Sequence, residues 1–248
     1  MAVRQRAILS GAAVVAAAFF GILAILVAQH VGPIERFDLS VHASLRQYAL
    51  AHPTWLSIMR NVTRLGDTLT VVVVDATLFA ICLWRSRPRA ALFVATVGVG
   101  VWVVRLVMRE LVGRARPDDA LWPANGLSFP SGHTTNSAAM ATLIVVVCWP
   151  LLRRAGRIAV VVAAVICAVS VGLSRVVGGV HWPSDVIGGL LLASAIVCAA
   201  AALFPPDPPA AKMDDSDQTQ GAVPGVEDGI QPHWGGTANS LGAWLPQL

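Results

Sequence analysis

Six apolar segments dominate the pattern of hydrophobic and polar positions along the chain. They lie near residues 7–29, 69–84, 90–108, 134–152, 158–173 and 185–204. Each approaches the roughly 20 residues that a helix needs to cross the hydrocarbon core of a bilayer, although the second and fifth require flanking residues. The pattern predicts an all-α fold, a six-helix transmembrane bundle that forms one domain over residues 1–204.

The two ends of the chain differ from the bundle in composition. Arg4 and Arg6 precede the first apolar segment, which is longer than the roughly 7 to 15 apolar residues of a cleaved signal peptide, so a retained anchor is predicted. Residues 205–248 are rich in Pro, Asp, Gly, Gln and Ser. This composition predicts a disordered cytoplasmic tail, in which Trp234 and Trp244 are either a docking motif or without function.

Composition and charge support a membrane location and indicate an orientation. Hydrophobic residues make up 56% of the chain and charged residues 13%, about half of the roughly 25% found in soluble domains. Arginines cluster in two short connections, 85–89 and 153–157, and such clusters favour the cytoplasmic side. With both termini also cytoplasmic, the connections 33–68, 109–133 and 174–184 lie outside a bacterial inner (plasma) membrane. The arginines are thus explained without nucleic acid, and no nucleic-acid partner is predicted.

The first outer connection, residues 33–68, is long and mixed in character. Apolar residues such as Leu45, Tyr48 and Trp55 alternate irregularly with polar and charged ones. An amphipathic helix lying in the membrane interface fits this pattern, and an ordinary surface loop fits it equally well.

The four cysteines lie inside the apolar segments, at Cys82, Cys148, Cys167 and Cys198. Their spacing is typical of neither a metal site nor a redox pair, and cysteines at different membrane depths are poorly placed for disulfides. We expect them to pack as small hydrophobic residues. No bound metal and no other cofactor is predicted.

Three arginines are spaced along the end of the third apolar segment and the residues that follow it. On a continuing α-helix, the spacing of Arg105, Arg109 and Arg116 places their side chains within roughly 40° of one another. Guanidinium groups match phosphate oxygens in shape and keep their charge, so this stripe predicts a phosphate clamp. Arg105 lies deeper in the apolar segment, where a structural ion pair with Asp75 of the preceding segment is expected.

A second cluster, Pro130-Ser131-Gly132-His133, stands directly before the fourth apolar segment. Pro130 and Ser131 suit the start of a helix, and a helix start presents free N–H groups that favour an anion. Gly132 permits close approach of a ligand, and His133 beside it can move a proton. A plain helix cap explains Ser131 equally well.

A third cluster, residues 174–185, joins the fifth and sixth apolar segments. If Pro183 begins the last helix, Asp185 in its first turn can reach back to His181 and hold one imidazole nitrogen, which leaves the other free to attack. Arg175 adds a further guanidinium group. Two histidines, an aspartate and several arginines at the outer ends of the helices predict a site for phosphate chemistry.

These clusters resemble the three-part motif of the type 2 phosphatidic acid phosphatase superfamily. That motif reads Lys, six residues, Arg-Pro; then Pro-Ser-Gly-His; then Ser-Arg, five residues, His, three residues, Asp. The second part is present unchanged at residues 130–133, and the third is present at residues 174–185. The first part departs once, because Arg109 stands at the Lys position, seven residues before Arg116.

The resemblance implies a membrane lipid phosphatase that works through a phosphohistidine, without metal or cofactor. It assigns His181 as the nucleophile, Asp185 as its orienting partner and His133 as the proton donor. Phosphate-binding residues implied by the motif are Arg109, Arg116, Ser131, Gly132 and Arg175. Polyprenyl diphosphate, phosphatidylglycerol phosphate and phosphatidic acid are the candidate substrates, and a bacterial source favours the first. A lipid phosphotransferase using the same site and a non-catalytic lipid-phosphate binding or transport protein remain alternatives, and the oligomeric state is not indicated.

Overall fold

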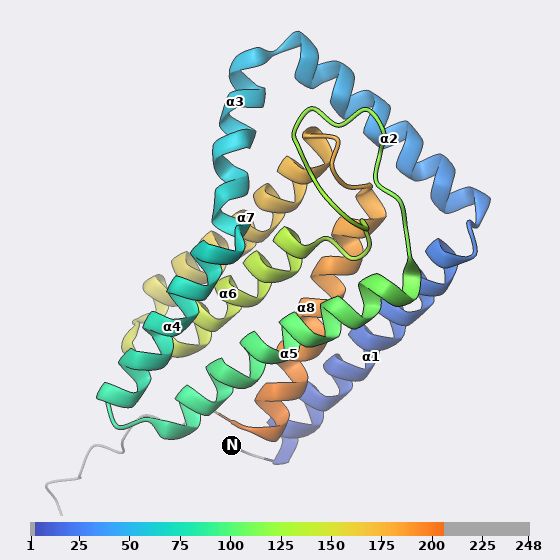
Figure 1. The fold of residues 1–248 in the computed structure, drawn as a ribbon. Helices are drawn as coiled ribbons and strands as arrows, with labels where there is room; N and C mark the ends of the chain where they lie inside the picture. Colours follow the sequence, from blue (N-terminus) through green and yellow to red (C-terminus); the bar gives the residue numbers. More distant parts are fainter. Residues whose placement is uncertain (1–2, 206–248) are drawn as a thin grey trace, which may run out of the picture. The chain divides into compact units, whose positions relative to one another are not determined.

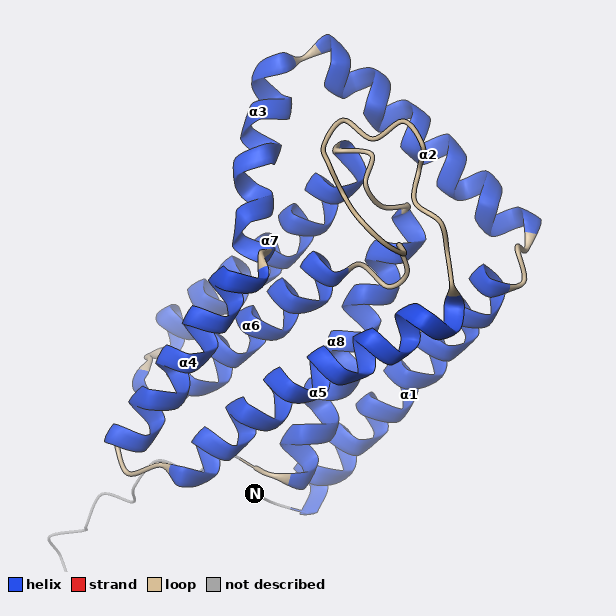
Figure 2. Cartoon of the chain, viewed as in Figure 1, coloured by secondary structure: helices blue, strands red, loops and turns tan. Residues whose placement is uncertain are grey.

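A computed structural model describes residues 3–205, which form eight α-helices and two 3-10 turns (Figures 1 and 2). The elements are α1 (Val3–Ala28), α2 (Gly32–Ala51), α3 (Pro53–Val62), η1 (Thr63–Gly66), α4 (Thr68–Trp84), α5 (Pro88–Val112), α6 (Gly132–Cys148), η2 (Trp149–Leu151), α7 (Arg154–Val177) and α8 (Pro183–Leu203). The six apolar segments correspond to α1, α4, α5, α6, α7 and α8, so the predicted all-α bundle is confirmed. Apart from Pro205, the predicted tail lies outside the described residues.

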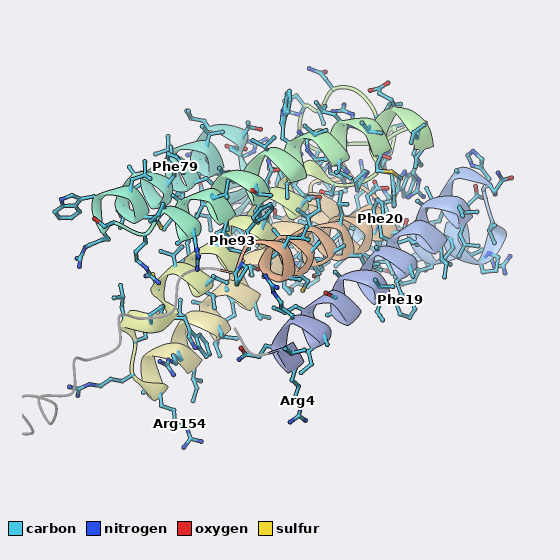
Figure 3. The ribbon with its side chains drawn as sticks, turned by 90° about the horizontal axis from the view of Figure 1, so that it is seen from below. Arg4, Phe19, Phe20, Phe79, Phe93 and Arg154 are labelled. Carbon is cyan, nitrogen blue, oxygen red and sulfur yellow. The ribbon has the colours of Figure 1, made fainter. Side chains whose placement is uncertain are left out.

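Five of these helices are long and apolar enough to cross a membrane by themselves: α1, α5, α6 with η2, α7 and α8. A sixth span arises if α3 with η1 and α4, which meet at a bend of 44°, are counted together. Their outward faces are apolar, as a lipid environment requires. Figure 3 shows Phe19 and Phe79 projecting from the bundle, whereas Phe20 and Phe93 are buried within it. The chain is a multi-pass membrane protein.

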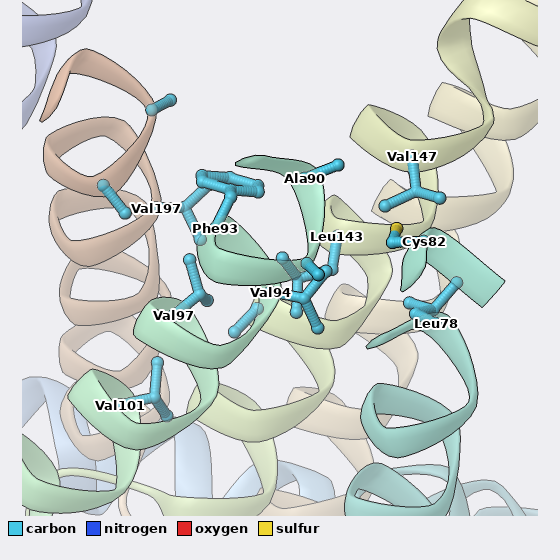
Figure 4. Close-up of a cluster of buried hydrophobic side chains, with 14 of the residues drawn as sticks. Leu78, Cys82, Ala90, Phe93, Val94, Val97, Val101, Leu143, Val147 and Val197 are labelled. Carbon is cyan, nitrogen blue, oxygen red and sulfur yellow. The ribbon is translucent and has the colours of Figure 1, made fainter. Parts of the chain in front are cut away.

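The interior of the bundle is built from small and branched side chains. α1 packs along α8, and α6 contacts α4, α5, α7 and α8. Figure 4 shows the main hydrophobic cluster, in which Phe93 and Val97 of α5 meet Leu143 of α6 and Val197 of α8. Such packing of spanning helices depends on close van der Waals contact, because lipid already surrounds their outer faces.

One end of the bundle is basic. The start of α1 and the end of α8 lie there together (Figure 1), and Arg6 lines a cavity with Arg89, Leu203 and Phe204. The connection between α6 and α7 is also basic, and the Arg157 guanidinium lies 5.0 Å from the centre of the Trp149 ring. Arginine next to tryptophan is typical of a membrane interface.

The opposite end is covered by α2 and α3, which form an arch over the loops (Figure 1). The sequence of residues 33–68 is compatible with either an interfacial helix or a surface loop. The structure forms helices there, with a break before Pro53. The buried residues of α2 are Asp38, His42 and Ala49, which share one helical face. Two polar side chains on an inward face indicate that α2 contacts a polar site.

Two expectations about the third apolar segment are wrong. α5 ends at Val112, because Gly113 adopts a left-handed conformation with φ of 65° that ends a helix without steric cost. Arg116 therefore belongs to the irregular segment 113–131 and not to a helical stripe. In the described part of the chain, Asp75 and Arg105 form no ion pair: Asp75 Oδ1 and Arg105 Nε are each buried without a hydrogen-bond partner.

Candidate active site

A polar cavity of about 390 Å³ lies beneath the arch, where three separate parts of the chain converge. The segment 113–131, the start of α6 and the loop between α7 and α8 meet there, and Figure 2 shows these loops beside one another below α2. Four arginines and two histidines are among its lining residues: Arg105, Arg109, Arg116, Arg175, His133 and His181. The convergence of these cationic and titratable groups makes the cavity a candidate site for an anion.

His181 is buried, and both of its ring nitrogens have partners. Nδ1 lies 3.3 Å from Asp185 Oδ2, and Nε2 lies 3.1 Å from an Arg116 guanidinium nitrogen. Arginine can only donate, so Nε2 accepts; Nδ1 then carries the proton and donates to Asp185. Burial lowers the pKa of His181 to about 4, against the hydrogen bond and charge of Asp185 and together with the charges of Arg116 and Arg175. At neutral pH the imidazole is uncharged, with its Nε2 lone pair on the cavity side.

Asp185 is fully buried, and its carboxylate is anchored from three directions. Oδ2 accepts from the Trp182 amide at 2.9 Å as well as from His181, and Oδ1 accepts from Arg114 at 2.8 Å. Pro183 begins α8 as expected, so Asp185 lies in the first turn of that helix, where a carboxylate is also favoured by the helix dipole.

Arg114 extends this anchor to α2. Its second terminal nitrogen donates to Asp38 Oδ2 at 2.6 Å, and Asp38 also accepts from the Ser184 amide and hydroxyl. Arg114 therefore bridges two buried carboxylates, Asp38 and Asp185. Neither Asp38 nor Arg114 belongs to the three-part motif, and sequence analysis missed both. The one sequence feature that could have indicated Asp38 is its spacing with His42 and Ala49, which places the three residues on one face of a helix.

Arg116 and Arg109 are held by backbone carbonyls of the loop in front of the cavity. Arg116 donates to the carbonyls of Asn125, Gly126 and Leu127, and Arg109 donates to that of Asn125 at 3.1 Å. Burial and the charge of Arg109 lower the pKa of Arg116 below its ordinary value, while Asp185 opposes this shift. Both guanidinium groups thus reach the cavity, with neutral oxygens as partners.

The remaining predicted residues occupy the side of the cavity formed by α6 and α7. Arg175 is buried and donates to Thr63 Oγ1 at 2.9 Å, and His133 Nε2 lies 2.8 Å from Asp67 Oδ1. Gly132 lines the cavity at the first position of α6, where the amide groups lack partners within the helix.

Ser131 lies behind this surface. Its side chain is fully buried, its hydroxyl accepts from Thr134 at 2.9 Å, and it makes no side-chain capping bond to α6. The Ser131 amide donates to the Asp185 carbonyl at 3.0 Å. In the structure, Ser131 therefore joins the start of α6 to the start of α8.

Comparison with known proteins identifies the family. Residues 107–207 match the family model of the PAP2 superfamily. The chain is 32% identical over 183 residues to phosphatidylglycerophosphatase B of Bacillus subtilis, an alignment that covers 70% of this chain and 85% of that protein. It is 29% identical to decaprenylphosphoryl-5-phosphoribose phosphatase of Mycobacterium tuberculosis, over 64% of this chain and 86% of the relative.

Solved structures agree with the sequence matches. The crystal structure of a transmembrane PAP2 type phosphatidylglycerolphosphate phosphatase from Bacillus subtilis superposes with a TM-score of 0.64 at 27% identity, covering 77% of this chain and 95% of that one. LpxE of Aquifex aeolicus shares the fold, with a TM-score of 0.53 at 20% identity over 67% of this chain and 94% of that one.

The chain belongs to the PAP2 superfamily, the type 2 phosphatidic acid phosphatases that its motif resembles. It is an integral-membrane lipid phosphatase, a hydrolase that acts on lipid phosphates. Across residues 3–205, no three His, Cys, Asp or Glu side chains form a group that could hold a metal ion. Cys148, Cys167 and Cys198 are free thiols, and Cys82 is buried in the hydrophobic cluster of the bundle.

Replacing Arg114 by Met is expected to destabilise the fold by about 3–5 kcal/mol, because the carboxylates of Asp38 and Asp185 lose the cation between them. Adding Asp38→Asn should recover part of this loss, since one uncompensated charge is removed. The free energy of unfolding is measured by denaturant titration in detergent. Arg46→Met is the control: its pair with the half-exposed Asp119 is worth about 0–1 kcal/mol. Equal losses in the two single variants would contradict a structural role of the Arg114 bridge.

Proposed function

We propose that this phosphatase hydrolyses a phosphate ester or diphosphate of a membrane lipid through a phosphohistidine on His181. The observation that supports this most strongly is the pairing of the imidazole: Nδ1 is held by Asp185, and Nε2 points to a cavity lined by guanidinium groups. A residue that only bound phosphate would need no oriented lone pair.

In the first step, the Nε2 lone pair attacks phosphorus as the bond to the leaving oxygen breaks. The leaving alcohol or phosphate oxygen takes a proton from His133, and Asp185 stabilises the positive charge that develops on His181. Arg109, Arg116, Arg175 and the amide at Gly132 bind the phosphoryl oxygens, while the guanidinium of Arg116 moves from Nε2 to a phosphoryl oxygen.

In the second step, water attacks the phosphohistidine. His133, now neutral, accepts a proton from this water as the P–N bond breaks. Inorganic phosphate leaves, and the electron pair of the broken bond returns to Nε2 of His181. No metal ion takes part in this scheme, because the guanidinium groups supply the charge stabilisation.

The substrate is proposed to be an amphiphile whose tails remain in the bilayer. An apolar groove of about 360 Å³ runs between α4 and α5 and shares Thr68 and Asn136 with the polar cavity. A single lipid phosphate could therefore place its phosphate in the cavity and its hydrocarbon chain in this groove. Relatives are named for phosphatidylglycerophosphate, a decaprenyl phosphoribose and lipid A, and four guanidinium groups suit a highly charged headgroup. Among the candidates we favour a polyprenyl diphosphate.

The cavity is proposed to face the extracytoplasmic side. It lies at the end of the bundle opposite the basic connections that hold Arg89 and Arg157, and clusters of this kind favour the cytoplasm. The start of α1, near Arg6, and the end of α8, near Phe204, are then both cytoplasmic.

Replacing His181 by Ala is expected to lower phosphate release by at least about 1,000-fold, because the nucleophile is lost. Release is measured in detergent, with EDTA present, over a panel of phosphatidic acid, phosphatidylglycerol phosphate and polyprenyl diphosphate. His52→Ala, at an exposed histidine that contacts Tyr48, is the matched control and should retain activity. Wild-type turnover by a folded His181→Ala protein would refute the proposal, and transfer of phosphate to an added alcohol in place of water would favour a phosphotransferase.

For a nitroaryl lipid phosphate, whose leaving group departs without a proton from His133, the pH profile of kcat/KM should remain flat well into the acid range. Protonation of Nε2 removes the attacking lone pair, so activity falls only as pH drops through the pKa of His181, about 4. Reassay at neutral pH after acid exposure separates this titration from unfolding. An acid limb near 6.5, the ordinary value for histidine, that remains after correction for the second ionisation of the substrate phosphate at about 6 would show that burial does not keep the nucleophile neutral.

A further inference from the structure

We infer that Asp67 is a positioning residue for His133, and that residues 63–67 form a fourth segment of the active site beside the three parts of the motif. This inference rests on the proposed function, in which His133 transfers the proton at the leaving oxygen. Asp67 lies between η1 and α4, 66 residues before His133 in the sequence.

Three contacts join this segment to the site. Asp67 Oδ1 lies 2.8 Å from His133 Nε2. Thr63 Oγ1 accepts a hydrogen bond of 2.9 Å from Arg175, so the same short turn holds one proposed phosphate ligand and the proposed proton donor. The third contact involves backbone: a Cβ on Gly66 would lie 2.8 Å from both the His133 carbonyl and Val171. Only glycine allows η1 to approach α6 this closely.

The charges around His133 explain what Asp67 supplies. Arg105, Arg109, Arg116 and Arg175 line the same cavity, and the described lining residues include no Asp or Glu. His181, the other titratable group on the lining, is neutral. Cations crowded around an imidazolium oppose its formation. Burial and the charge of Arg175 lower the pKa of His133 to about 4, and the hydrogen bond and charge of Asp67, which contacts His133 from outside the cavity lining, act in the opposite direction.

The contact between Asp67 and His133 also determines which ring nitrogen of His133 transfers the proton. With Nε2–H donating to Asp67, Nδ1 is the nitrogen that carries the exchangeable proton. When the P–O bond breaks, this proton passes to the leaving oxygen; in the second step Nδ1 takes a proton from the attacking water. Asp67 keeps Nε2–H throughout and stabilises the charged ring, in the way that Asp185 acts on His181.

The test uses an alkyl phosphate and a nitroaryl phosphate with the same hydrocarbon chain. A nitroaryl leaving group departs without protonation, whereas an alkoxide needs a proton. Asp67→Asn should lower kcat/KM for the alkyl substrate by at least about 10-fold, move the alkaline limb of its pH profile to lower pH, and leave the nitroaryl substrate nearly unchanged. Asp67→Glu, which keeps the carboxylate, should recover most of the alkyl activity.

Asp119→Asn is the matched control. The side chain of Asp119 is as exposed as that of Asp67, at 48%, and it lies at the same distance, 2.8 Å, from a histidine Nε2, that of His42. His42 does not line the cavity, and nor does Asp119. Any effect of this variant should be equal on the two substrates.

His133→Gln is assayed in parallel, so that failure of the inference can be told from failure of the proposed function. If His133→Gln loses alkyl activity selectively but Asp67→Asn shows equal losses, or none, on both substrates, the role of Asp67 is refuted and that of His133 stands. If His133→Gln also shows no selectivity, the proposed proton transfer fails, and the inference fails with it.

Discussion

The proposed active site depends on how the charge of one buried carboxylate is paired and hydrogen-bonded. Asp185 has no solvent exposure, and a charge in such a place is tolerated only when it is paired and hydrogen-bonded. Arg114, the Trp182 amide and His181 supply those partners, and Arg114 is itself anchored by Asp38 of α2. The arch over the bundle, the loop after α5 and the start of α8 are therefore joined through a single set of charges.

Three of the arginines around the site fall into two groups with different partners. Arg114 faces two carboxylates and acts as a permanent part of the fold. Arg109 and Arg116 face backbone carbonyls of residues 125–127, and charged phosphate oxygens are stronger acceptors than these neutral groups. A bound phosphate can therefore replace the carbonyls on the second group without disturbing the first.

Sequence predicted the features that depend on local spacing. The lengths of the apolar segments gave the six bundle helices, and the four-residue interval between His181 and Asp185 predicted their contact at the start of α8. Partners distant in the sequence were missed: Asp38 lies 76 residues from Arg114, and Asp67 lies 66 from His133. The helical arginine stripe failed because Gly113 ends α5 one turn after Arg109, and the expected Asp75–Arg105 pair failed because it required the register between two helices.

We propose that a neutral imidazole, that of His181 oriented by Asp185, becomes phosphorylated on Nε2. The most direct measurement stops the reaction with lipid phosphate in alkali, where the P–N bond of phosphohistidine persists, and maps the phosphoryl group by mass spectrometry. We expect a phosphoryl group on Nε2 of His181. A phosphoryl group on His133 or on Nδ1 of His181, or rapid phosphate release with no modified histidine at any time, would contradict it.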